Sequence, residues 1–224
     1  MKTIKILFSI LAGIFLIVSC GSGTKSGKGG NVSDVDGNVY STVTIGGQTW
    51  MTENLRTTKY NDGTAIPNVT DKAWSELKTG AYSWYDNDSA TYKSTYGAVY
   101  NWYTVHTGKL CPAGWHVPTD KEWRILTDFW GGELVAGKEM KATTGWIGNG
   151  NENETNSSGF SAIPCGYRNY KGSYGSSGKS GYWWSSTPFY DNAWYCVLFK
   201  GDATANKFYG RTQSGFSVRC IKDK

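Results

Sequence analysis

The stretch that decides the fold is CPAGWHVPTDKEWRILTDFWGG, residues 111–132. Its segment Thr119-Asp120-Lys121-Glu122 matches the capping box, in which a Thr hydroxyl and a Glu carboxylate each accept a hydrogen bond from an unpaired amide at a helix start. Apolar residues then recur every three or four positions, as at Trp123 and Leu126, and a pair of glycines ends the stretch. The pattern predicts a helix over residues 120–130 with one face in the core.

His116 stands just before this helix and raises the alternative of a reactive centre. The sequence has two histidines, His106 and His116, and no G-x-S-x-G segment of the kind that presents a nucleophilic serine. A hydrogen-bonded structural histidine is therefore the preferred interpretation of His116, with a catalytic base as the alternative. Glu122 is interpreted mainly as a helix cap.

The first twenty residues have the order of a bacterial lipoprotein signal. Two lysines precede an apolar run that is too short to span a membrane, and the run ends at Ile17-Val18-Ser19-Cys20, which resembles a lipobox. We expect residues 1–19 to be a signal peptide and Cys20 to be lipidated. An ordinary cleaved signal and an uncleaved anchor are the alternatives.

Residues 20–33 are nearly all Gly, Ser, Lys and Thr, and we expect them to form a flexible tether. The remainder, residues 34–224, fits one domain because no second linker of this kind interrupts it. The formal net charge is +5, with basic residues scattered singly, whereas a nucleic-acid surface needs a basic cluster. We expect no nucleic-acid partner.

Hydrophobic patterning predicts an α+β domain. Residues 39–51 alternate around Gly46-Gly47 and predict a β-hairpin, and residues 96–105 have the spacing of a short helix. Residues 57–94 should be long loops with short ordered pieces. From Phe160 onward, short β segments alternate with polar turns, so we expect two short helices followed by a small antiparallel sheet with long loops.

Four cysteines, Cys111, Cys165, Cys196 and Cys220, remain after Cys20. An even number in an exported chain favours two disulfides. Free thiols and a metal site are the alternatives, and the metal site is disfavoured because only two histidines are present and no CxxC pair occurs.

Six segments in order carry a resemblance: DVDGNVYSTVTIGGQTWMTENLRTTKYNDGTAIP, YGAVYNWYTV, CPAGWHVPTDKEW, SSGFSAIPCGYRN, GYWWSST and GFSVRCIKD. Together they resemble the Fibrobacter succinogenes major paralogous domain, which is common in lipoproteins of Bacteroidota, over residues 34–223. That family is similar in pattern to the C-type lectin-like and formylglycine-generating-enzyme-like fold. The resemblance implies a compact α+β domain whose two ends meet in one sheet, and it implies the disulfides Cys111–Cys220 and Cys165–Cys196.

Catalytic and metal motifs are missing or incomplete in the sequence. The paired C-x4-C cysteines of formylglycine-generating enzymes do not occur, and GSYGSSGKS places its first glycine one residue too early for a P-loop. Asp34-x-Asp36-Gly37-Asn38 and Asp86-Asn87-Asp88 have calcium-like spacing but lack the bidentate carboxylate at loop position 12. We interpret both as turns and expect no metal and no cofactor.

Aromatic residues are the main positive signal, with 11 Trp and 15 Tyr in the chain. Most rings must fill the core, and we expect Trp115, Trp123 and Trp183 there. The segments GYWWSSTPFYDNAWY and KFYGRTQ also mix aromatic, amide and charged residues, as recognition loops do. Alternation along the strand puts Tyr182 and Trp184 opposite Trp183, and the expected ligand-binding residues are Tyr182, Trp184, Tyr190, Asp191, Asn192, Trp194, Tyr209 and Arg211.

The sequence thus favours a non-enzymatic binding or adhesion module of the cell envelope, with a glycan or an envelope protein as its ligand. The alternatives are an envelope hydrolase that uses Asp191 or Glu139 and a purely structural surface protein. Gly21 does not resemble the aspartate that retains some lipoproteins at the inner membrane, so we expect attachment to the outer membrane.

Overall fold

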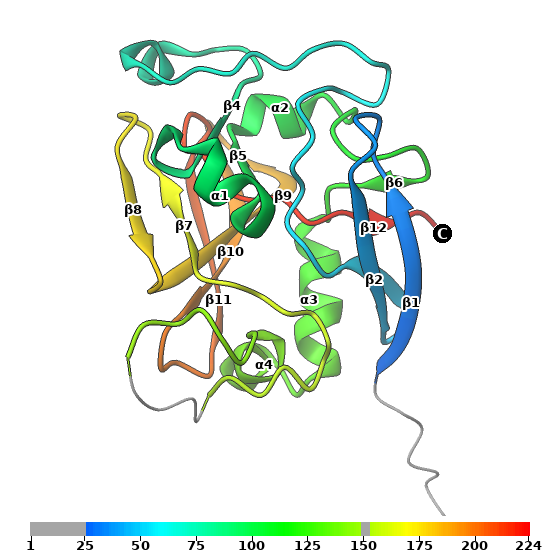
Figure 1. Ribbon diagram of the computed structural model, residues 1–224. Helices are drawn as coiled ribbons and strands as arrows, with labels where there is room; N and C mark the ends of the chain where they lie inside the picture. The colour runs from blue at the N-terminus through cyan, green and yellow to red at the C-terminus, as the bar shows by residue number, and fades with distance from the viewer. Residues whose placement is uncertain (1–25, 149–152) are drawn as a thin grey trace, which may run out of the picture.

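The computed structural model describes residues 26–148 and 153–224, and its strands form two five-stranded sheets and one two-stranded sheet (Figure 1). The first sheet contains the strands from both ends of the described chain. In spatial order its strands are β1 (Ser26–Ser33), β2 (Val39–Ile45), β3 (Gln48–Met51), β12 (Ile221–Lys222) and β6 (Trp115–His116).

The second sheet comes from the C-terminal part of the chain. In spatial order its strands are β11 (Ala205–Arg211), β10 (Asn192–Phe199), β9 (Ser180–Phe189), β7 (Cys165–Arg168) and β8 (Tyr174–Ser177). All neighbours are antiparallel except β7 and β9. The two-stranded sheet pairs β4 (Tyr82–Trp84) with β5 (Ala98–Tyr100).

Four α-helices lie in the described part of the chain: α1 (Ser89–Tyr96), α2 (Trp102–His106), α3 (Asp120–Phe129) and α4 (Glu133–Met140). Two short 3-10 helices, η1 (Lys72–Glu76) and η2 (Tyr85–Asn87), interrupt the long loops. The α+β class is confirmed. The expected layout of two helices followed by one sheet is wrong, because four helices are present and the first sheet opens and closes the described chain. Within that part, no helix is both long and apolar enough to cross a membrane.

Helix α3 confirms the capping box. Thr119 Oγ1 accepts from the amide of Glu122, and Glu122 Oε2 accepts from the amide of Thr119 at 2.8 Å. Trp123 and Leu126 are buried, whereas Phe129 is partly exposed, so the apolar stripe is narrower than expected. Trp123 and Trp183 are buried in the core as expected. Trp115 is only half-buried and packs against the edge of a core cluster.

The helix expected over residues 96–105 is wrong in its first half. Ala98–Tyr100 is strand β5, and only Trp102–His106 is helical. Gly97 interrupts the chain with a φ of 71°, which favours glycine, and the Asn101 side chain then accepts from the Thr104 amide and caps α2. Residues 98–100 form a strand because they pair with β4, although their apolar residues have the spacing of a helix.

The ordered part of the chain begins earlier than the sequence suggests. Ser26–Ser33 was expected to belong to the tether, but it forms the edge strand β1 and pairs with β2. Backbone hydrogen bonds to β2 make this strand, and Val32 is its one apolar residue, which packs against a core cluster. The expected signal peptide and Cys20 lie outside the described residues.

The second sheet is buried on both faces at its centre. Trp183 and Trp184 are consecutive residues of β9, and both have no exposed surface. Trp183 packs with Trp50, Trp123 and Phe160 in one core cluster, whereas Trp184 packs in the other, which also holds Phe216. The sheet is therefore the middle layer between two cores.

The disulfide Cys111–Cys220 is present in the structure. The second expected pair is wrong, because Cys165 and Cys196 are both free and buried. Cys165 begins β7 and Cys196 lies on β10, and strand β9 runs between these two strands. Strands two apart are separated by roughly 10 Å, beyond the reach of a disulfide.

Candidate functional site

The turn between β9 and β10 projects into solvent. Phe189 pairs with Asn192, so Tyr190 and Asp191 form the two-residue connection. Tyr190 adopts a φ of 51° and its side chain is 91% exposed. A positive φ is uncommon for a bulky residue, and the Tyr190 ring meets the partly buried Phe189 ring edge-on at 5.0 Å. A tyrosine in that position is costly for folding alone.

A hollow lies beside this turn, and we call it the hairpin-tip hollow. Strand pairing of Asn192 with Arg211 brings the end of β11 next to the turn. Tyr103, on α2, closes the third side, and its hydroxyl accepts hydrogen bonds from Thr212 Oγ1 at 3.2 Å and Gln213 Nε2 at 3.3 Å. The hollow has a volume of about 560 Å³ and is lined by Tyr103, Tyr190, Asp191, Asn192, Arg211, Thr212 and Gln213.

Two charged side chains, Asp191 and Arg211, line the hairpin-tip hollow. Over residues 26–148 and 153–224, neither Asp191 nor Arg211 forms an ion pair. The Arg211 guanidinium lies 4.7 Å from the centre of the Tyr170 ring, which fixes its direction without satisfying its donors. Hydrogen-bond donors and an acceptor are therefore available to a ligand.

Two further expected site residues, Trp194 and Tyr209, lie on the neighbouring strands. Their rings contact each other at 5.7 Å and contact Phe189 at 4.9 and 4.3 Å. Lys207 Nζ lies 5.0 Å from the Trp194 ring and forms an ion pair with Asp120. This aromatic cluster supports the hairpin and leaves Tyr209 about half exposed.

The structure thus brings together four of the eight expected residues in one hollow: Tyr190, Asp191, Asn192 and Arg211. Trp184 was wrongly expected at the surface. It does point away from Trp183, but its face of the sheet is covered, and its indole N–H donates to the backbone oxygen of Tyr100. Tyr182 is half-buried and lines a different hollow.

Three lining residues were missed by sequence reasoning. Thr212 and Gln213 directly follow Arg211 in the segment KFYGRTQ, so the signal was present in the polar run. Tyr103 carried no signal, because its place depends on how α2 packs near the end of β11, far away in sequence.

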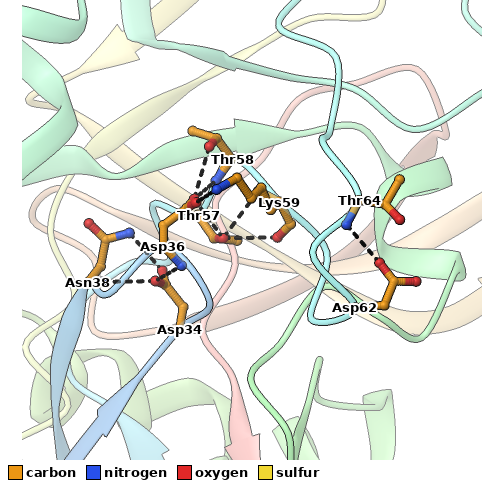
Figure 2. Close-up of polar contacts among 8 residues, drawn as sticks. All are labelled: Asp34, Asp36, Asn38, Thr57, Thr58, Lys59, Asp62 and Thr64. Atoms are coloured by element: carbon orange, nitrogen blue, oxygen red, sulfur yellow. Dashed lines mark hydrogen bonds and ion pairs between the residues drawn. The ribbon is translucent and has the colours of Figure 1, made fainter.

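Figure 2 shows the turn between β1 and β2, where Asp34 and Asp36 were interpreted as turn residues. Asp34 accepts hydrogen bonds from the amides of Asp36 and Asn38, at 3.0 and 2.9 Å. Asp36 accepts from the Thr58 amide at 2.6 Å and pairs with Lys59 at 3.2 Å. These contacts confirm the turn, since protein donors engage both carboxylates.

The Asp86-Asn87-Asp88 segment also forms a local structural element. The Asp88 carboxylate accepts from the Thr91 amide at 3.0 Å and caps α1. Asn87 Oδ1 accepts from the Tyr174 hydroxyl. The interpretation of this segment as turn residues is therefore confirmed.

His116 is held by two carboxylates. Its Nε2 lies 2.9 Å from Glu122 Oε1, and its Nδ1 lies 2.6 Å from Asp223 Oδ1. Partial burial lowers the pKa of His116, but the bonds to Asp223 and Glu122 outweigh that effect and raise it overall. The ring connects β6, α3 and Asp223, so the predicted hydrogen bonding of His116 is confirmed, and a structural role stays a prediction.

Comparison with known proteins identifies the family. The family model described as the Fibrobacter succinogenes major domain matches residues 43–222, most of the chain, and the chain therefore belongs to this family. No curated protein and no solved structure matches it.

Proposed function

We propose that this member of the Fibrobacter succinogenes major domain family is a non-enzymatic binding module of the cell envelope and that its ligand is a glycan. The observation that carries the proposal is the hairpin-tip hollow, where an almost fully exposed tyrosine stands beside a carboxylate and a guanidinium that form no ion pair within the described residues. An envelope protein is the second candidate ligand.

Carbohydrate recognition suits this mixture of groups. A sugar ring has apolar C–H faces that pack on an aromatic ring such as Tyr190 and hydroxyls that need both donors and acceptors. Asp191 supplies acceptors, Arg211 supplies donors, and the Asn192 and Gln213 amides supply both. The volume of about 560 Å³ lies in the range of small-molecule sites.

A glycosidase that used Asp191 and Glu139 as its pair of carboxylates is disfavoured by the positions of these two residues. Asp191 lies at the turn that begins β10, whereas Glu139 lies on α4, which packs against the turn after β10 through the bond from the Lys138 amide to Ala203 O. The eight residues of β10 separate these turns by roughly 26 Å. Glycosidases place their two carboxylates within about 10 Å of each other.

A lipid anchor at Cys20 would be compatible with a ligand site at the hairpin-tip hollow, because the start of β1 and this hollow lie at opposite ends of the domain. In Figure 1, α4 and the start of β1 lie at the lower end, and α2 lies at the upper end. Since Tyr103 of α2 lines the hairpin-tip hollow, a tether leading to β1 would present that hollow away from an outer membrane.

The proposed C-type lectin-like fold is supported by one topological feature. Ile221 near the end of the chain pairs with Trp50 of the N-terminal hairpin, so the two ends meet in one sheet. In such a fold the long loops carry the ligand site, and fold-level analogy alone does not define a ligand.

The test is a glycan array probed with the full chain in a detergent that has no sugar headgroup. We expect wild type to bind a defined set of glycans and Arg211→Ala to lose that signal. Lys179→Ala is the matched control, because it removes one positive charge from an exposed side chain outside the hollow. Equal binding by wild type and Arg211→Ala would contradict the proposed site, and an array without signal would favour a protein ligand.

A further inference from the structure

A second hollow, which we call the tyrosine hollow, lies on the β7–β9–β10 part of the second sheet. It has a volume of about 240 Å³ and is lined by Tyr167, Asn169, Tyr182, Tyr195, Ser214 and Phe216. These residues come from three strands and from the loops that follow β7 and β11.

Aromatic rings form the base of the tyrosine hollow. Tyr182 stacks on Phe216 with ring centres 5.3 Å apart and an interplanar angle of 24°. Tyr167 meets Tyr182 edge-on at 4.9 Å, and Tyr195 meets Phe216 at 4.7 Å. The rings hold one another in place, so the surface that they offer is preformed.

Three polar groups of the hollow, the hydroxyls of Tyr167 and Tyr195 and the Nδ2 group of Asn169, have no hydrogen-bond partner among the described residues. Asn169 uses Oδ1 to accept from the amides of Lys171 and Ser173, which leaves its Nδ2 group as a donor. No acidic or basic side chain lines this hollow.

The linings of the two hollows meet along the chain. Gln213 lines the hairpin-tip hollow, and the next residue, Ser214, lines the tyrosine hollow. The Arg211 guanidinium lies over the ring of Tyr170, which follows Asn169 in sequence. The segment from Arg211 to Ser214 therefore forms a shared border between a charged hollow and a neutral one.

We propose that the tyrosine hollow is a second subsite for an uncharged sugar unit and that the ligand is an oligosaccharide chain extending into it from the hairpin-tip hollow. The proposal rests on the proposed function and adds the length and charge of the ligand. Aromatic rings with hydroxyl and amide donors, and without a charged group, match a neutral hexose better than an acidic one.

The experiment is ¹⁹F NMR of the full chain labelled with 3-fluorotyrosine, with signals assigned by Tyr→Phe variants. The probes are β-1,4- and β-1,3-linked glucose and mannose oligomers of one to six units. We expect the longer oligomers to shift the signals of both Tyr190 and Tyr195. Tyr195→Phe should weaken hexamer binding roughly 2- to 10-fold through one lost hydrogen bond, whereas Tyr92→Phe on α1 should leave it unchanged.

The two proposals fail in different ways. If every oligomer that shifts Tyr190 leaves Tyr195 unmoved, the second subsite is wrong and the hairpin-tip site stands. If no oligomer shifts either signal, these neutral glycans are not ligands and the extended-chain proposal is wrong, whereas the glycan proposal is decided separately by the array.

Discussion

Strands β9 and β10 differ sharply between their centre and their tip, although both regions are rich in aromatic residues. At the centre, Trp183 and Trp184 are fully buried, and their indole N–H groups donate to Asn54 Oδ1 and Tyr100 O. At the tip, Tyr190 is almost fully exposed. The difference shows that neighbouring layers, and not the aromatic content of the segment, decide whether a ring is buried in the core or exposed to solvent.

The central network explains why the core tolerates so many polar groups. Asn54 accepts from Trp183 Nε1 at 2.8 Å and from Arg219 Nε at 3.0 Å. Arg219 also donates to the backbone oxygens of Phe160 and Ser161 and lies over the Phe160 ring. A satisfied buried network of this kind fixes one packing arrangement, because leaving any member unpaired is costly.

The largest expected effect comes from the centre. Trp183→Ala should lower the free energy of unfolding by about 3 to 5 kcal/mol, because it opens a cavity and removes one of the two donors to Asn54 Oδ1. Urea unfolding followed by circular dichroism measures this change. Phe208→Ala is the control from the same sheet, since Phe208 is about half exposed, and it should cost less than about 1 kcal/mol. Similar costs for the two variants would remove the distinction between centre and surface.

A smaller effect, the pH dependence of the unfolding free energy, tests whether the contacts of His116 with Glu122 and Asp223 stabilise the fold. Because the folded-state pKa of His116 is raised, its pairing with Glu122 and Asp223 stabilises the protein fully below the unfolded pKa of about 6.5 and is lost as the pH rises through the folded value. Wild type should therefore exceed His116→Gln in unfolding free energy by more at pH 6 than at pH 9. The gap should be below about 1 kcal/mol, since the ring is partly exposed.

Asp223→Asn sharpens this measurement by removing one of the two partners. It should shrink the pH-dependent gap without abolishing it, because Glu122 still contacts Nε2. The gap is measured again by adding His116→Gln to Asp223→Asn. If His116→Gln has the same pH-dependent effect in both backgrounds, the contact at Nδ1 contributes nothing.

Sequence patterns predicted the parts of the fold that depend on local chemistry. The capping box before Trp123 and the hairpin around Gly46-Gly47 need only neighbouring residues, and both are confirmed. The burial of Trp184 could not be predicted from local patterns. Alternation placed it correctly opposite Trp183, but its burial depends on α2 and β5, which cover that face from 80 residues away in sequence.

The candidate site was predicted in part for the same reason. Tyr190, Asp191 and Asn192 share one turn, so a polar aromatic run was enough to find them. Tyr103 and the border with the tyrosine hollow arise only when β11 and α2 come together. Likewise, the wrong disulfide Cys165–Cys196 came from a resemblance that could not show β9 running between the two cysteines.

The most direct test of the account is thermal unfolding of wild type and of a Tyr190→Ala, Arg211→Ala double variant, each with and without the oligosaccharide selected by the glycan array. A ligand that binds only the folded state raises Tm by mass action. Without ligand, the two proteins should have Tm values within about 2 °C, because exposed side chains contribute little to stability. With ligand, only the Tm of wild type should rise. A double variant that melts many degrees lower without ligand, or that gains as much from the ligand as wild type, would contradict the assignment of the hairpin tip to recognition.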